Sequence, residues 1–440
     1  MSSVKVRFAP SPTGHMHIGN TRTALFNWLW AKKMGGTFML RVDDTDFARS
    51  KKEYEDSMRE SLKWLGLVWT QEARQSARFE RYKEVTQKLI SEGRIYPCYE
   101  TPEELEFKRK RSLSKGLPPI YDRQALSYTK EDIASFEREG RKPHYRFKLN
   151  VGEIKWTDEV RGEVKYDAAN LSDPIIIRED GSYLYHLPSV IDDVDFGITH
   201  ILRGEDHVTN TASQIQMFEA IGGTVPTFAH LPLLTGKEGK LSKRLGSLGV
   251  RELKADGVEN MAICSYLAKL GTSEEIKPYY DLEELAKTLD FSKIGRAQPK
   301  FDVEELRHFN IKYIHSLPYD VVKDRISAGQ TFWEDVKANL EKVEDVAVWD
   351  KICNGEITPV IENKALTDAA ASLLPDTDLT VDVFNTWIDE IKSKTGLKGK
   401  DLFHPVRLAL TGEASGPELK ILLSLIGYKK AYRRLKGEKA

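Results

Sequence analysis

Cysteine is scarce in this chain, and long hydrophobic runs are missing. Only three cysteines occur among 440 residues: Cys98, Cys264 and Cys353. Thiols this few and this far apart exclude a disulfide framework, so we expect buried free cysteines in a reducing compartment. No uncharged apolar run approaches the roughly 18 residues of a membrane span. The first residues form a strand pattern with Lys5 and Arg7 and have no apolar signal core, so a cytoplasmic location is expected.

The chain also lacks an excess of either charge. It holds 66 lysines and arginines against 67 aspartates and glutamates, a net charge of −1. Neutrality neither favours nor excludes a nucleic-acid partner, because binding depends on how charge is distributed. Basic residues do cluster, at Lys108–Arg111 and in a tail that holds Lys429, Lys430, Arg433, Arg434, Lys436 and Lys439. Each cluster alone is more typical of a solvated helix face.

The hydrophobic pattern changes along the chain. Strand and helix patterns alternate over residues 1–95 and return near 199–234, which predicts an α/β fold with a parallel sheet. Residues 96–185 break this rhythm and favour an insertion with its own antiparallel sheet. From about residue 246 the patterns are helical, and a separate helical domain is expected to begin near 310. A chain of this length is expected to hold several domains.

Two segments carry the chemistry. The strand Val4–Ala9 leads through the turn Pro10–Asn20 into an apolar helix, so unpaired backbone N–H groups face the strand's carboxyl end, where anions bind. Much later, Lys240–Arg244 places three cations among glycines, a pattern that favours a loop closing over an anion. Taken singly, each segment is ordinary, since such turns and basic loops are common.

Taken together, the two segments resemble the signatures of class I aminoacyl-tRNA synthetases. Pro10–Asn20 resembles the HIGH signature, and Lys240–Arg244 resembles the KMSKS signature. The sequence of Arg7–Gly14 is similar to that of the glutamyl type of these synthetases. Further matches to that type lie at Arg41–Asp46, Asp180–Leu187, Val190–Asp193, His200–Asp206 and His404–Gly412. The chain is therefore identified as a member of the bacterial-type glutamyl-tRNA synthetase family.

The resemblance implies an architecture. We expect a Rossmann-type parallel sheet with an α+β insertion, followed by an all-α anticodon-binding domain. The implied divisions are residues 1–95 and 189–245 for the two halves of the catalytic domain, 96–188 for an insertion that binds the acceptor end, 246–310 for a helical domain on the tRNA stem, and 311–440 for the anticodon-binding domain.

The implied activity is ATP-dependent attachment of L-glutamate to tRNA-Glu through a glutamyl-adenylate, with ATP bound as its Mg²⁺ complex. His17 would donate to phosphate oxygens, and Gly19 would let the adenosine approach the backbone. Lys243, assisted by Lys240, would neutralise the leaving pyrophosphate. Asn20 stands where the family has a second histidine, and His15 is incidental. The remaining ATP-binding residues implied are Pro12, Gly14 and Ser242.

Glutamate requires partners for two carboxylates and one ammonium. Arg7 and Arg203 are planar, permanently charged groups suited to carboxylates, and which one takes which carboxylate is left open. Asp43, where the family often has Glu, would hold the ammonium. Ala9, Ser11, Tyr185 and Ser189 complete the expected set.

Zinc marks a departure from part of the family. Some members carry Cys-x-Cys and then Cys-x-His in the insertion, whereas here Cys98 is followed by Tyr99 and Glu100 and no second cysteine occurs there. A tetrahedral thiolate site therefore cannot be built, and we expect no bound metal.

The resemblance also implies tRNA contacts. Lys108–Arg111 would meet the acceptor end, and the C-terminal helices would read unstacked anticodon bases. Available there are Trp333, Trp349, Trp387, Arg407, Tyr432 and Arg433, although core packing is the more typical role of a tryptophan. Glutamate activation is expected to need tRNA, and the chain is expected to be a monomer.

Other interpretations stay open. A second substrate, tRNA-Gln, is a hypothesis, since no arginine lies in Lys337–Leu340, near where the family discriminates. A paralogue that glutamylates a modified tRNA nucleotide would lack the anticodon domain. A non-catalytic tRNA-binding paralogue would have decayed signatures. A small-molecule nucleotidyltransferase would need no helical tail.

Overall fold

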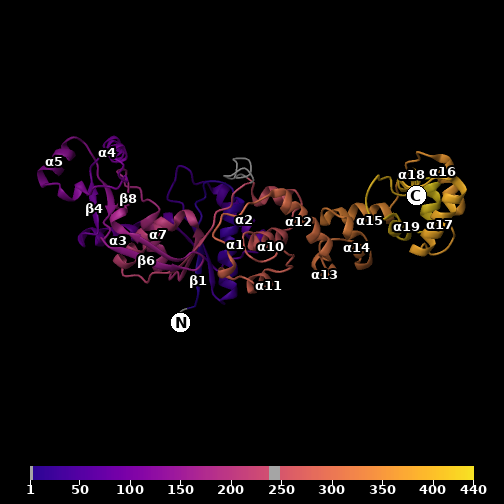
Figure 1. Cartoon of the computed structure of the whole chain (residues 1–440), viewed down its shortest axis with the longest axis horizontal. Helices are drawn as coiled ribbons and strands as arrows, with labels where there is room; N and C mark the ends of the chain where they lie inside the picture. Colours follow the sequence, from indigo (N-terminus) through magenta and orange to yellow (C-terminus); the bar gives the residue numbers. More distant parts are fainter. Residues whose placement is uncertain (1–2, 237–247) are drawn as a thin grey trace. The chain divides into compact units, whose positions relative to one another are not determined.

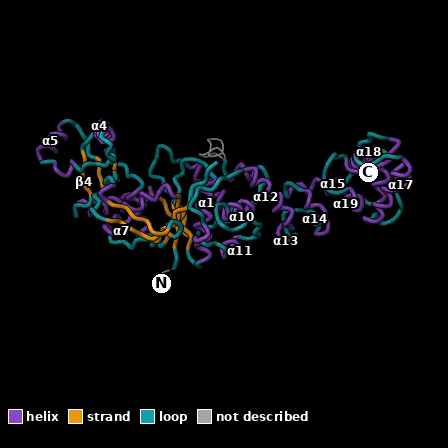
Figure 2. The backbone as a smooth tube through the Cα atoms, viewed as in Figure 1, coloured by secondary structure: helices purple, strands orange, loops and turns teal. Residues whose placement is uncertain are grey.

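The computed structural model describes residues 3–236 and 248–440 of the chain (Figure 1). They form two compact units. The first comprises Met1–Ala255 and Cys264–Asp302, and the second comprises Asp256–Ile263 and Val303–Ala440. The named strands all belong to the first unit, and the described part of the second consists of helices and loops (Figure 2). The finer domain divisions expected from the sequence stay predictions.

A parallel sheet forms the centre of the first unit. Strand β1 (Lys5–Phe8) pairs in parallel with β2 (Thr37–Val42), which pairs in parallel with β3 (Gln71–Arg74). On the other side of β1 lies β9 (His200–Gly204), where the Thr199 N–H donates to the Lys5 carbonyl at 2.9 Å. Strand β9 pairs in parallel with β10 (Thr227–Leu231). The predicted α/β class with a parallel sheet is confirmed.

Helix α1 (Ile18–Lys33) connects β1 to β2 and sets the entrance of the site. His17 caps its first turn, and Leu25, Phe26 and Leu29 are buried. The chain then turns back at Gly35, which has a φ of +60°. A Cβ at Gly36 would lie 2.2 Å from the Val4 carbonyl oxygen, so the return into β2 requires glycine. This close approach fixes where α1 sits against β1.

The other helices of the catalytic half pack on the sheet or on one another. Leu187, Ile191, Met217 and Phe218 come from two of these helices and belong to one buried core. Their bounds are Lys52–Trp64 for α2, Phe79–Ser91 for α3, His186–Asp195 for α6 and Val208–Ile221 for α7.

The insertion contains the expected antiparallel sheet, in the order β4-β5-β8. Its strands are β4 (Ile95–Cys98), β5 (His144–Phe147) and β8 (Ile175–Ile177), with helices α4 (Pro102–Ser114) and α5 (Lys130–Arg138) between the first two. A second antiparallel pair, β6 (Glu153–Asp158) and β7 (Gly162–Asp167), belongs instead to the sheet of β9 and β10, because β6 pairs with β10 at Asp158 and Phe228.

The remaining described elements are helical. Trp333 and Trp387 lie in the core of the second unit and donate to the Leu317 and Ala370 carbonyls. The helices are α9 (Val250–Ala255), α10 (Asn260–Lys269), α11 (Leu282–Lys287), α12 (Val303–Ser316), α13 (Tyr319–Val322), α14 (Gln330–Val336), α15 (Val346–Asn354), α16 (Lys364–Leu373), α17 (Val381–Thr395), α18 (Lys400–Thr411), α19 (Leu419–Ile426) and α20 (Tyr428–Leu435).

The three cysteines are free and buried, as expected. Burial raises the pKa of Cys264 to about 12 and that of Cys353 to about 12, so both thiols are unreactive at neutral pH. Among the described helices, none combines the length and the apolar character needed to cross a bilayer.

Candidate active site

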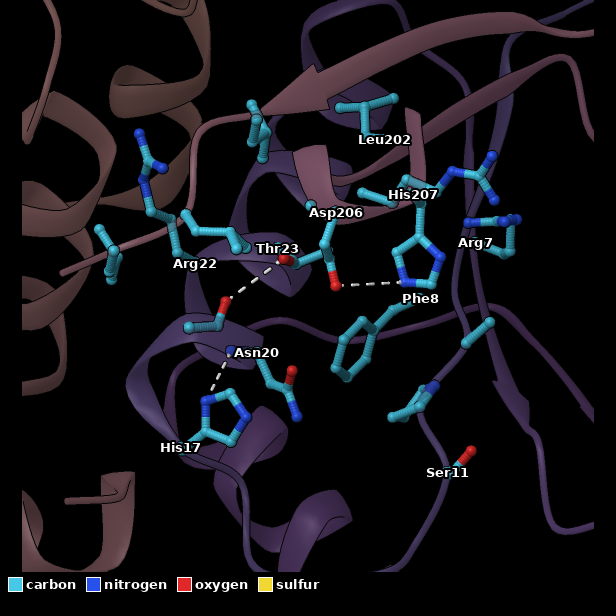
Figure 3. A pocket seen from close by; sticks show the side chains of 18 of the residues that line it. Arg7, Phe8, Ser11, His17, Asn20, Arg22, Thr23, Leu202, Asp206 and His207 are labelled. Carbon is cyan, nitrogen blue, oxygen red and sulfur yellow. Dashed lines mark hydrogen bonds and ion pairs between the residues drawn. The ribbon is translucent and has the colours of Figure 1, made fainter. Parts of the chain in front are cut away.

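A cavity of about 480 Å³ opens where β1, β9 and β10 end and α1 begins (Figure 3). Open α/β sheets bind ligands at the carboxyl ends of their strands. The residues that line the cavity are Arg7, Phe8, Ala9, Pro10, Ser11, Thr13, His17, Gly19, Asn20, Arg22, Thr23, Tyr185, Leu202, Arg203, Gly204, Asp206, His207, Leu231, Pro232, Leu233 and Leu234.

His17 stands at the N-terminus of α1 with a defined orientation. Its Nδ1 accepts a hydrogen bond from the Asn20 N–H at 3.2 Å (Figure 3). A ring nitrogen that accepts carries no proton, so the proton of the neutral ring lies on Nε2. Desolvation lowers the pKa of His17 and favours this neutral form. The ring therefore offers one N–H donor beside the helix N-terminus, where anions are favoured.

Gly19 and Asn20 complete this end of the cavity. A Cβ on Gly19 would lie 3.1 Å from the Cε1 and Nδ1 atoms of His17, so a larger residue would displace the ring. Pro12 and Gly14 do not line the cavity. Pro12 is buried and its carbonyl accepts from the Lys51 N–H at 3.0 Å, while Gly14 is exposed. Their contact with ATP stays a prediction.

Lys240, Ser242 and Lys243 lie outside the described residues. The described chain on either side is held to the first unit. Thr235 pairs with Lys300, and Gly249 pairs with His17. Gly249 and its neighbour Val250 are thus hydrogen-bonded to the turn that carries His17.

Arg203 is buried at the end of β9 and has only neutral partners among the described residues. Its Nε donates to His230 Nε2 at 3.3 Å, its Nη1 to the Tyr185 hydroxyl at 3.0 Å, and its Nη2 to Thr211 Oγ1 at 2.6 Å. A guanidinium has five N–H donors, so two of them have no partner within residues 3–236 and 248–440. The charge of Arg203 is therefore available to an anion in the cavity.

Arg7, at the end of β1, is the second buried guanidinium of the cavity. Its Nε donates to Asp193 Oδ1 at 3.0 Å. That same oxygen also accepts from Arg41 Nη1 at 2.8 Å. One oxygen of Asp193 thus serves two arginines, although Arg41 is also paired with Asp43. Ala9, Ser11 and Tyr185 line the same space, so five of the seven residues expected to bind glutamate are brought together.

Asp43 and Ser189 lie outside the lining. Both carboxylate oxygens of Asp43 accept from Arg41, at 2.6 Å from Nε and 3.0 Å from Nη2. Burial raises the pKa of Asp43 to about 6, against the lowering effect of Arg41. Ser189 is buried, and its Oγ has no hydrogen-bond partner among the described residues. Their roles toward glutamate stay predictions.

Several lining residues were missed by the sequence reasoning. Arg22 donates to the Pro232 carbonyl at 2.8 Å and to the Leu270 carbonyl at 3.1 Å, and burial lowers its pKa to about 10. His207 has a pKa lowered to about 4 by burial and by the charge of Arg203. The signal for Arg22 was its place three residues after Gly19, on the same helix face. His207 directly follows the Gly204–Asp206 motif.

The insertion contains a cluster of side chains that could be considered as metal ligands. Cys98 and His144 are cross-strand partners, and they lie with Glu100 such that one ligand atom of each is within 4.8 Å of the others. However, Lys108 Nζ lies 3.3 Å from Glu100 Oε1, which also accepts from the Tyr121 hydroxyl at 2.8 Å. One thiol and an occupied carboxylate do not fit a closed four-ligand zinc site.

Comparisons with known proteins agree with this geometry. The family model described as tRNA synthetases class I (E and Q), catalytic domain, matches residues 3–308, and the model described as anticodon binding domain matches residues 274–438. Glutamate–tRNA ligase 1 of Maricaulis maris is 51% identical over 99% of this chain and 100% of its own length. Glutamate–tRNA ligase of Azospirillum brasilense is 51% identical over 100% of both chains.

Solved structures give the same picture. The crystal structure of a glutamate tRNA ligase from Elizabethkingia meningosepticum in complex with its amino acid matches with a TM-score of 0.80 and 27% identity, covering 99% of this chain and 98% of that one. Glutamate-tRNA synthetase from Elizabethkingia anophelis matches with a TM-score of 0.78 and 27% identity, covering 99% of both chains.

The fold is thus that of a class I aminoacyl-tRNA synthetase. The chain belongs to the class I tRNA synthetases of the E and Q type, and within them to the glutamate–tRNA ligase family.

Proposed function

We propose that the chain uses ATP to attach L-glutamate to tRNA-Glu through a glutamyl-adenylate. The observation that carries this proposal is the pair of buried guanidinium groups, Arg7 and Arg203, in the cavity beside His17. Arg203 has no anionic partner among the described residues, and Arg7 shares one carboxylate oxygen with Arg41. Both guanidinium groups can therefore accept a carboxylate of a dicarboxylate substrate. The glutamate–tRNA ligases that the chain resembles support the same reaction.

In the first step, the α-carboxylate of glutamate attacks the α-phosphorus of ATP. A new bond forms between the carboxylate oxygen and phosphorus, and the bond to the bridging oxygen breaks, so pyrophosphate leaves. His17 Nε2–H would donate to a phosphate oxygen, and Mg²⁺ bound with ATP would offset its negative charge. Positioning and charge neutralisation supply most of the catalysis in such a transfer.

Lys243, with Lys240, is proposed to neutralise the leaving pyrophosphate. Lys243→Ala should lower the rate of adenylate formation by about 10²–10³-fold, by analogy with the loss of one oxyanion donor. The test is glutamate-dependent exchange between pyrophosphate and ATP with tRNA-Glu present. If Lys243→Ala retains the exchange rate within a few-fold, the role assigned to Lys243 is wrong. Brisk exchange by the unchanged chain without any tRNA would contradict the expected need for tRNA.

In the second step, a terminal ribose hydroxyl of tRNA attacks the carbonyl carbon of the adenylate and AMP leaves. We propose α20 as one tRNA-binding surface. Tyr432 is exposed on it, and its exposed neighbour Arg433 bonds only to the chain's last residues, Glu438 and Lys439, among the described residues. By contrast, Arg434 is fully buried and binds three carbonyls, so its role is structural. The buried Trp333, Trp349 and Trp387 fill the core.

The basic run Lys108–Arg111 supports a contact with the acceptor end of tRNA less strongly than α20 supports a tRNA-binding surface. Lys108 is engaged with Glu100, Asp122 and Gln124, and Arg109 pairs with Glu106 at 2.9 Å. Much of this positive charge is thus already balanced, and an exposed pair of this kind is weak. Arg111 is the member of the run with no ion pair among the described residues.

A second substrate, tRNA-Gln, is proposed on the absence of an arginine in Lys337–Leu340. Lys337 Nζ donates to the Leu317 carbonyl at 3.2 Å and pairs with Glu334 at 2.5 Å, so it is committed within the unit. Charging purified tRNA-Glu and tRNA-Gln side by side tests this. Glutamate on tRNA-Glu alone would contradict relaxed specificity and leave the main proposal intact.

A further inference from the structure

A buried histidine lies behind Arg203, on the side away from the cavity. His230, on β10, is fully buried and does not line the cavity. Its Nδ1 lies 2.5 Å from Asp158 Oδ2, and its Nε2 lies 3.3 Å from Arg203 Nε and 2.9 Å from Thr211 Oγ1. The imidazole therefore connects a carboxylate on β6 to the guanidinium that faces the substrate.

The hydrogen bonds define which ring nitrogen carries the proton. Arg203 Nε–H can only donate, so His230 Nε2 must accept and must be unprotonated. The proton then lies on Nδ1, which donates to Asp158. Burial lowers the pKa of His230, and this keeps the ring neutral. A protonated His230 would place a second cation against Arg203.

Asp158 is built to stay ionised. Its Oδ1 accepts from the N–H groups of Val160, Arg161 and His230, at 3.1, 3.0 and 3.1 Å. Burial raises the pKa of Asp158, but the hydrogen bond from His230 and those from the backbone outweigh it and lower the pKa. A carboxylate held in this way orients the imidazole, as carboxylates orient the histidines that ligate metals.

We propose that Asp158 and His230 are positioning residues that hold Arg203 in the orientation that binds a carboxylate of the substrate. The inference rests on the proposed role of Arg203 toward glutamate. The groups that touch Arg203 are all neutral, since Tyr185, Thr211 and His230 supply only hydrogen bonds. The guanidinium is thus fixed in direction without an ion pair that would compete with the substrate.

The test measures KM for glutamate and for ATP separately, in pyrophosphate exchange with tRNA-Glu present. His230→Leu removes the ring's contacts with Asp158, Arg203 and Thr211. Asp158→Asn removes the charge that holds the proton on Nδ1. We expect KM for glutamate to rise about 10- to 100-fold in both, the range found when one hydrogen bond to a charged group or an orienting partner is lost. KM for ATP should stay unchanged.

His230→Gln provides a conservative variant, because its amide oxygen can still accept from Arg203. It should recover part of the glutamate affinity that His230→Leu loses. Ser265→Ala is a matched control, since Ser265 is equally buried, bonds to the Tyr279 backbone and does not line the cavity. It should leave both KM values unchanged while lowering the melting temperature.

The outcomes separate the inference from the proposed function. If the wild-type chain attaches glutamate to tRNA but KM for glutamate is unchanged in Asp158→Asn and His230→Gln, the inference is wrong and the function stands. A parallel rise of KM for glutamate and ATP also overturns it, because that is general damage to the unit. If the wild-type chain does not use glutamate, the proposed function itself is wrong. Should His230→Leu fail to fold, the two milder variants decide.

Discussion

Arg203 carries a full charge in a buried place and has only neutral partners among the described residues. Lysine would keep the charge but lose the planar fork that binds a carboxylate through two hydrogen bonds. We expect Arg203→Lys to raise KM for glutamate roughly 10- to 100-fold, since it removes hydrogen bonds between charged groups. Exchange kinetics at varied glutamate measure this. Arg138→Lys, on the exposed helix α5, is the control, and equal effects of the two changes would contradict the prediction.

His17 and its neighbour Asn20 should differ in importance. His17→Ala removes the N–H that we propose donates to a phosphate oxygen, and it should lower kcat by about 10²–10³-fold. Asn20 holds His17 through its backbone N–H, so Asn20→Ala leaves that hydrogen bond intact and should cost less. Single-turnover adenylate formation measures both variants. A larger loss in Asn20→Ala would mean that its amide, and not the imidazole, meets the phosphates.

For single residues, the sequence predicts those site residues that lie inside contiguous motifs. Arg7, His17, Tyr185 and Arg203 were found because each belongs to a short recognisable stretch, and the structure places all four on one cavity. His230 was not found, because its role depends on Asp158, which is distant in sequence and meets it only when β6 pairs beside β10. No local pattern reports such a contact.

Elements meet at a few points of very close approach. The clearest is Gly36, between α1 and β2, where a Cβ would lie 2.2 Å from the Val4 carbonyl oxygen. Gly36→Ala should destabilise the first unit by about 1–3 kcal/mol, the usual cost of forcing extra volume into a packed site. Urea unfolding measures it. Gly329→Ala is the control, because a Cβ there meets nothing within 4 Å and its φ is −73°. Equal stability losses in both variants would contradict the prediction.

Element prediction from the sequence worked for apolar segments. The strands at β1, β2 and β9 and helix α1 were expected because their side chains alternate or repeat with the right period. Strand β3 is not expected from the sequence, since Gln71–Arg74 is mostly polar, and the strand lies at an edge where its pairing is with β2. The sequence predicts an antiparallel sheet in the insertion but does not single out the hairpin of β6 and β7, which pairing at Asp158 and Phe228 attaches to β10.

On the scale of the whole molecule, pH should act on stability through buried histidines of the first unit. The pKa values of His144, His186 and His207 are each lowered to about 4, mainly by burial and then by nearby arginines. Between pH 4 and the ordinary value of 6.5, the unfolded chain binds protons that the folded chain does not. The three histidines should therefore make stability rise with pH across this window, with their contribution complete above pH 6.5. Asp43, whose pKa is raised to about 6, opposes this with a single group.

Urea unfolding of the full chain at pH 5 and pH 7 tests this dependence. The midpoint for the first unit should be lower at pH 5. Replacing His144 by Gln should flatten the dependence, because one proton-binding difference is removed, and it does so outside the cavity. A midpoint that rises on going to pH 5 would contradict the sign.

Metal content is a further property of the whole chain. Because Lys108 and Tyr121 already engage Glu100 beside the lone thiol of Cys98, purified chain should contain far less than one zinc per molecule. Elemental analysis after exposure to zinc and gel filtration measures this. Stoichiometric zinc that is lost in Cys98→Ser and His144→Ala would show the expectation to be wrong.

The shared carboxylate of Asp193 has a consequence for the enzyme at rest. Arg7 and Arg41 both draw on one oxygen of that group, and Arg203 has no anion at all among the described residues. Burial and the charge of Arg7 both lower the pKa of Arg203, so the folded chain without substrate retains repulsion between these two guanidinium groups, and an incoming dicarboxylate relieves it. A ligand that binds only the folded form adds stability in proportion to the logarithm of its concentration. The free energy of unfolding of the first unit should then increase with the concentration of glutamate.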